Sequence, residues 1–85
     1  MKEYDFFRDK RVTVMGLGRL GRGLGDARYI ANAGAADVLV TDLKPESELR
    51  DSVAALASLP NIRFRLGEHN TDDFINRDLI LVAAG

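Results

Sequence analysis

Apolar and polar residues alternate along this 85-residue chain in blocks that predict strands and helices in turn. Two β-branched apolar runs, residues 11–15 and 37–42, are typical of buried strands. Between them, from about residue 20 to residue 33, apolar side chains recur at spacings of three and four, which predicts a helix. Gly34 follows as a C-terminal stop for that helix. The first half of the chain is therefore predicted to fold as strand, helix, strand.

The second half of the chain repeats this alternation. Apolar residues within 49–59 predict a helix that starts near Pro45 and ends before Pro60. In residues 62–66, IRFRL, apolar side chains alternate with arginines, which is typical of an edge strand with one solvated face. A fourth strand is predicted over residues 78–84, DLILVAA.

A short helix is predicted in the loop that precedes this last strand. Thr71 is its expected N-cap, and Asp72 and Asp73 are expected to complement the positive end of the helix dipole. The complete order is then β-α-β-α-β-α-β, which predicts a parallel sheet with right-handed crossovers. We expect an α/β, Rossmann-like fold with strand order 3-2-1-4 and helices on both faces.

The most informative motif is VTVMGLGRLGRGLGD, residues 12–26, where the first strand runs into the first helix. Gly16, Gly18 and Gly21 form G-x-G-x-x-G, in which the glycines allow a tight turn, a close phosphate and a closely packed helix, respectively. The helix N-terminus then favours an anion. Asp42, at the end of the second strand, can accept hydrogen bonds from a ribose hydroxyl or a base N–H. Together these features favour a ligand site over a purely architectural turn.

Two further glycines, Gly23 and Gly25, are unexpected inside a helix, where each costs about 1 kcal/mol relative to alanine. They predict either a late helix start after a wide loop or a close approach of two backbones. A wide loop would leave Arg19 free to meet a diphosphate. For Arg22, a solvated side chain is the favoured interpretation.

Composition narrows the function classes. The formal net charge of -1 gives no electrostatic reason to expect a nucleic acid or a membrane as partner. The chain has no cysteine, which excludes disulfides and thiolate metal sites and fits a cytoplasmic location. It ends on its most apolar run, so we expect residues 1–85 to be one domain cut from a longer protein.

The remaining polar residues suggest structural roles. The lone histidine, His69, is interpreted as a turn or capping residue, and Arg63 and Arg65 as a solvated strand edge that discourages strand addition. Neither a serine-histidine-aspartate set nor a metal-ligand constellation is present in the sequence. We therefore expect no catalytic residue, cofactor or metal in this part of the protein.

Three segments, VTVMGLGRLGRG, VLVTDLKP and FRLGEH…DDF…DLILVAAG, together resemble the N-terminal domain of the Mur ligases. The likeness is greatest to the family members that add D-glutamate, and it extends from about Lys10 to Gly85. It implies that the domain binds the uridine diphosphate end of the nucleotide-sugar substrate, UDP-N-acetylmuramoyl-L-alanine. The residues that the resemblance places along the diphosphate are Gly18, Arg19 and Leu20. Those that it places around the uracil and ribose are Asp42, Leu43, Lys44 and Gly85.

The resemblance also implies an ATP-dependent, amide-forming enzyme of peptidoglycan synthesis. Its ATP and Mg²⁺ would be held by a central domain, because this chain contains no G-x-x-x-x-G-K-[ST] motif. Three departures from the family pattern are Leu20 in place of a small hydroxyl residue, the glycine-rich GRGLG, and Ala83-Ala84-Gly85 in place of serine-proline-glycine.

Two other functions fit the glycine turn. One is an NAD- or NADP-binding Rossmann domain of a dehydrogenase or a nucleotide-sensing regulatory module. The other is an interaction module in which the turn is only architectural.

Overall fold

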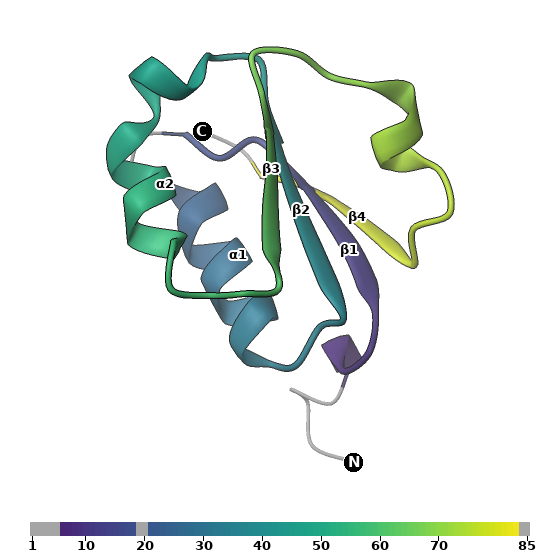
Figure 1. Cartoon of the computed structure of the whole chain (residues 1–85). Coiled ribbons are helices and arrows are strands. Elements are labelled where there is room, and N and C mark those ends of the chain that lie inside the picture. The colour runs from purple at the N-terminus through teal and green to yellow at the C-terminus, as the bar shows by residue number, and fades with distance from the viewer. Residues whose placement is uncertain (1–5, 19–20, 84–85) are drawn as a thin grey trace.

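The computed structural model describes residues 6–18 and 21–83, apart from the side chain of Arg22. In this part of the chain, four parallel strands form one sheet in the order β3-β2-β1-β4 (Figure 1). The strands are β1 (Arg11–Met15), β2 (Asp37–Asp42), β3 (Ile62–Leu66) and β4 (Leu79–Val82). The predicted fold class and strand order are confirmed.

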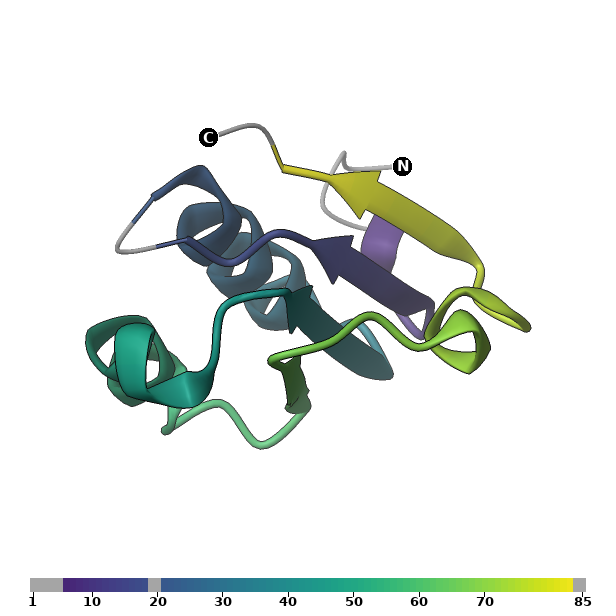
Figure 2. The same cartoon turned by 90° about the horizontal axis from the view of Figure 1, so that it is seen from above.

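Two α-helices, α1 (Arg22–Asn32) and α2 (Arg50–Leu56), cover one face of the sheet (Figure 2). Alternate residues of the two central strands point toward them, and these side chains form the apolar core together with residues of both helices and of the segment before α2. The strand residues of this core are Val12, Val14, Val38 and Val40, and the helix-side residues are Leu24, Ala27, Ile30, Leu49 and Leu56. Successive side chains of a strand point to opposite faces, so these valines lie on the helix side of the sheet and Thr13 on the other.

The ends of the helices follow local backbone chemistry. Gly34 has φ +93° and ends α1, where its N–H donates to the Ala31 carbonyl and the Ala35 N–H donates to the Ile30 carbonyl. This pair of bonds is the Schellman arrangement that glycine permits, so the predicted stop is confirmed. The predicted second helix is divided: a 3-10 turn, η2 (Glu46–Glu48), precedes α2.

The crossover from β3 to β4 covers the other face of the sheet (Figure 2). Its only helical part among the described residues is one 3-10 turn, η3 (Thr71–Phe74), where an α-helix on the second face was expected. Thr71 does not cap this turn, contrary to the prediction. Asn70 is the cap, because its side-chain oxygen lies at the right distance, 2.9 Å, to accept from the Asp72 N–H two residues on.

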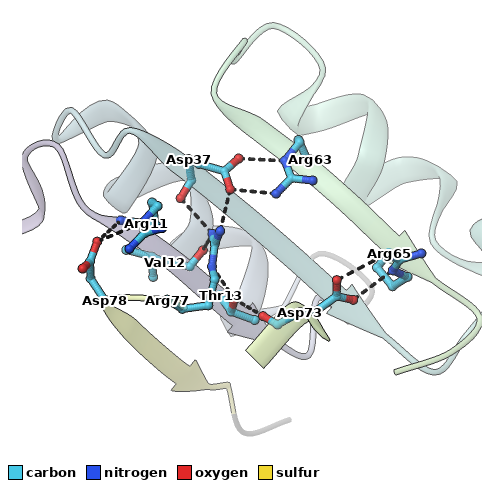
Figure 3. A network of polar contacts seen from close by, with 9 residues as sticks. All are labelled: Arg11, Val12, Thr13, Asp37, Arg63, Arg65, Asp73, Arg77 and Asp78. Carbon is cyan, nitrogen blue, oxygen red and sulfur yellow. Dashed lines mark hydrogen bonds and ion pairs between the residues drawn. The ribbon is translucent and has the colours of Figure 1, made fainter. Parts of the chain in front are cut away.

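A network of polar side chains holds the crossover on this face (Figure 3). The guanidinium of Arg77 is largely buried and donates to Thr13 Oγ1 at 3.0 Å, to the Val12 carbonyl at 2.9 Å and to Asp37. Thr13 Oγ1 in turn donates to the carbonyl oxygen of Asp73 at 2.7 Å. Buried polar atoms need such partners, so the network determines where the crossover lies.

The arginines of β3 belong to the same network. β3 is an edge strand of the sheet, as predicted, but its arginines are ion-paired rather than only solvated. Arg63 binds Asp37 through two hydrogen bonds of 2.8 Å, and Arg65 binds Asp73 through two of 2.9 and 3.2 Å. Asp73 is buried, so its main partner is this guanidinium and not the helix dipole.

The glycine in the first turn of α1 explains how closely this helix packs. A Cβ atom at Gly23 would overlap the carbonyl oxygen of Gly16 and lie 2.8 Å from that of Leu17. A close approach of the helix to the glycine turn is therefore made at Gly23, and Gly21 precedes the helix as its N-cap. Of the two predicted explanations, the close approach of two backbones applies to Gly23, and a late helix start does not account for the two glycines, because both lie within α1. Gly25 is exposed, and a Cβ atom added there would meet nothing within 4 Å outside its own helix.

We expect opposite effects from two alanine substitutions in α1. Gly23→Ala should lower the free energy of unfolding by about 2 kcal/mol or more, because its Cβ overpacks against rigid backbone. Gly25→Ala should raise it by about 0.5–1 kcal/mol, because the site is open and alanine favours the helix. Urea unfolding followed by circular dichroism measures both changes. Equal effects of the two substitutions would contradict the close packing at Gly23.

Candidate functional site

The glycine turn lies at the carboxyl ends of the strands, beside β2 and β4 (Figure 1). Gly16 and Gly18 have φ values of +103° and +70°, which favour glycine. The Gly16 N–H donates to the Thr41 carbonyl at 2.7 Å, and a Cβ at Gly16 would lie 3.1 Å from the Ala83 carbonyl oxygen. The turn therefore leaves β1 sharply and passes close to both neighbouring strands, where ligands bind in folds of this type.

The carboxylate of Asp42 holds the turn in place. Its Oδ2 accepts hydrogen bonds from the Leu17 and Gly18 N–H groups, both at 3.0 Å, and its Oδ1 accepts from the Lys44 N–H at 2.9 Å. Burial acts to raise the pKa of Asp42, but these three N–H groups and the charge of Lys44 outweigh it and lower the pKa. The carboxylate is thus ionised and bonded to two separate segments.

A second polar side chain, which sequence reasoning missed, holds the turn from the other side. Ser52 of α2 is fully buried, and its Oγ donates to the Gly18 carbonyl at 2.7 Å. Both backbone polar groups of Gly18 are therefore bonded within the protein. The sequence offers no signal for this role, because a serine in an amphipathic helix is ordinary.

These contacts change what the turn offers to a ligand. The Gly18 N–H, expected to lie along a diphosphate, already donates to Asp42. The N-terminus of α1 follows at once, and it has neither a side-chain cap nor an acidic residue in its first turn. The positive end of this helix dipole is the part of the turn that suits an anion.

A hollow of about 320 Å³ opens beside the turn. Its lining comes from the ends of β1, β2 and β4 and from the crossover, and consists of Met15, Gly16, Asp42, Leu43, Lys44, His69, Val82 and Ala83. It brings together three of the predicted site residues: Asp42, Leu43 and Lys44. Of the other four, Gly18 is in the neighbouring turn, and Arg19, Leu20 and Gly85 lie outside the described residues.

The residues that the structure describes contain no group of three or more histidine, cysteine, aspartate or glutamate side chains that could hold a metal ion. No helix in this part of the chain is both long and apolar enough to cross a membrane.

Several curated proteins similar to this chain carry the name UDP-N-acetylmuramoylalanine–D-glutamate ligase. The chain is 54% identical over 72 residues to the protein of Roseiflexus sp. (strain RS-1), covering 85% of this chain and 15% of that protein. It is 42% identical over 84 residues to that of Bdellovibrio bacteriovorus, covering 99% and 17%, and 44% identical over 72 residues to that of Treponema pallidum, covering 85% and 13%. The resemblance to the Mur ligases is confirmed, and the chain spans less than a fifth of these relatives' length.

No family model matches the chain. Among solved structures, a thioredoxin reductase from Gloeobacter violaceus has a TM-score of 0.68 at 16% sequence identity, covering 96% of this chain and 28% of that one. A likeness at this identity shows the Rossmann-like fold alone.

We expect Asp42→Asn to destabilise the protein and to reduce its acid sensitivity. The amide turns an N–H₂ group toward backbone donors, which should lower the free energy of unfolding at pH 7 by about 1–3 kcal/mol. Because the pKa of Asp42 is lowered, its stabilisation is present in full above about pH 4 and is lost as the pH falls through the folded-state pKa. Urea unfolding at pH 7 and pH 3 measures both effects.

The matched control for this prediction is Asp51→Asn, which alters an exposed carboxylate in α2. It should change the unfolding free energy by no more than about 0.5 kcal/mol and leave the pH dependence intact. An Asp42 variant as stable as this control at pH 7 would contradict the conclusion that the Asp42 carboxylate holds the glycine turn in place.

Proposed function

We propose that this chain is the N-terminal, substrate-binding domain of a Mur ligase that joins D-glutamate to UDP-N-acetylmuramoyl-L-alanine. The observation that carries the proposal is the 54% identity over 72 residues with a protein of that name. The structure adds a parallel sheet with a glycine turn and a hollow at the carboxyl ends of its strands. The part of the substrate bound here is the uridine diphosphate.

The two ends of this nucleotide are proposed to meet different surfaces. The diphosphate lies at the N-terminus of α1, where the helix dipole and the guanidinium of Arg19 favour its charge. The uridine enters the hollow lined by Asp42, Leu43 and Lys44. Gly18 and Leu20 border the diphosphate, and Gly85 borders the uridine, as the family resemblance implies.

The chemistry of the proposed reaction takes place elsewhere in the longer protein. A central domain supplies ATP and Mg²⁺, and a third binds the amino acid, so that an acyl phosphate forms and the D-glutamate amine attacks it. The role of this chain is to anchor the far end of the substrate. Binding energy from a remote group of this kind fixes the reacting carboxyl in place. The proposed location is the cytoplasm, where ATP and nucleotide sugars are available.

The geometry of Asp42 argues against the NAD-binding alternative. In that alternative the carboxylate grips both hydroxyls of a ribose. An ionised carboxylate accepts about four hydrogen bonds, and Asp42 already accepts three from backbone N–H groups. About one acceptor position remains, which is too few for two hydroxyls.

The direct test is calorimetric titration of the chain with four ligands. We expect binding of UDP-N-acetylmuramoyl-L-alanine and of UDP, and weaker or undetectable binding of NAD and NADP. Both uridine ligands share the end of the molecule that this domain is proposed to hold. Binding of NAD with no response to either uridine ligand would overturn the proposal.

A second titration tests the diphosphate site. Arg19→Ala should weaken binding of UDP by about tenfold, because a hydrogen bond between charged groups is lost, and should leave the affinity for uridine unchanged. Arg50→Ala removes an exposed arginine of α2 and serves as the control. Unchanged UDP affinity in the Arg19 variant would remove that residue from the site.

A further inference from the structure

His69 has unused hydrogen-bonding capacity at the edge of the hollow. It lines the hollow together with Asp42, Leu43 and Lys44. Its Nδ1 atom is covered by protein and has no hydrogen-bond partner within the described residues. Its ring contact there is an edge-to-face arrangement with Phe74, with ring centroids 6.1 Å apart. The environment of Nδ1 therefore bears on which ring nitrogen can act as a donor to a ligand.

The covered Nδ1 indicates which proton the ring carries. A proton on Nδ1 would bury an N–H donor without an acceptor, which costs more than a buried, unprotonated nitrogen. We therefore assign the ring N–H that is available to a ligand to Nε2. Nε2 is then a hydrogen-bond donor, suited to an oxygen acceptor.

The segment that carries His69 is held at both ends. Before it, the Gly67 N–H donates to the Asp42 carbonyl at 2.9 Å, which ties the crossover to the end of β2. After it, Asp73 is bound by Arg65 and by the hydroxyl of Thr13 (Figure 3). These anchors lie within four residues of His69.

Phe74 follows Asp73 directly and contacts the imidazole. The polar network on the second face of the sheet therefore reaches His69 through one ring contact. A side chain anchored in this way has little rotamer freedom to lose when a ligand binds.

We propose that His69 recognises the nucleoside end of the bound nucleotide, with its Nε2–H donating to an oxygen of the base or ribose. The inference rests on the proposed function and adds a residue to the same site. The phosphates are assigned elsewhere, because the charge-favouring part of the turn is the N-terminus of α1. The Nε2–H of His69 is instead available to an oxygen of the nucleoside in the hollow that this residue lines.

The test compares the binding of uridine, UMP and UDP to wild type and to two variants. His69→Leu should weaken all three ligands by the same factor, about three- to tenfold, because each contains the nucleoside and one hydrogen bond is lost. His69→Gln keeps an N–H donor with a reach similar to that of Nε2 and should retain more of the affinity. Thr71→Ala changes an exposed residue of the same crossover and is the control.

A spectroscopic measurement on wild type does not depend on any variant folding. Nitrogen-15 NMR of the imidazole should show a proton on Nε2 in the free protein and a shift of the Nε2 resonance when UDP is added. Absence of that shift would overturn the role of His69. So would a His69→Leu variant that binds uridine as tightly as wild type, or a loss limited to UDP. If wild type binds none of the three ligands, the proposed function itself fails.

Discussion

One buried carboxylate determines the shape of the candidate site. Asp42 accepts hydrogen bonds from two backbone N–H groups of the glycine turn and from the backbone N–H of Lys44. The end of β2 and the turn that follows β1 therefore form one unit. Both backbone polar groups of Gly18 are paired within the protein, to Asp42 and to Ser52. The same pairing leaves the start of α1 as the surface that attracts an anion.

The two faces of the sheet are stabilised by different forces. On the side of α1 and α2, apolar side chains are removed from water, and the contact tolerates changes that keep volume and pattern. On the other side, guanidinium–carboxylate pairs and the buried hydroxyl of Thr13 hold the crossover. Such ion pairs add little to the free energy of unfolding, but each forms only when its two side chains meet in one arrangement. They therefore fix the position of the crossover more than they stabilise it. The position of the crossover in turn places His69 beside the hollow.

Much of the fold could be predicted from periodicity alone. The end of α1 at Gly34 and the edge position of β3 follow from local patterns, and the strand order follows from the fold class that the succession of elements indicates. The errors arose where a residue's role depends on a distant partner. Arg65 and Asp73 read as a solvated strand and a helix start, yet they bind each other across the second face. The N-cap of η3 is a different, local case: Asn70 and Thr71 are neighbours and both residue types cap helices, so the sequence alone does not separate them.

The sequence by itself determined the succession of elements, the position of the glycine turn and the resemblance to the Mur ligases. All three can be recognised from residue types in order along the chain. Only the tertiary structure decided which glycine lets the helix approach the turn and where each polar side chain finds its partner. Gly23 meets Gly16 through a contact between backbones, and Asp42 and Ser52 reach Gly18 from other segments. Such contacts depend on the distances between packed elements, and no local spacing along the chain encodes them.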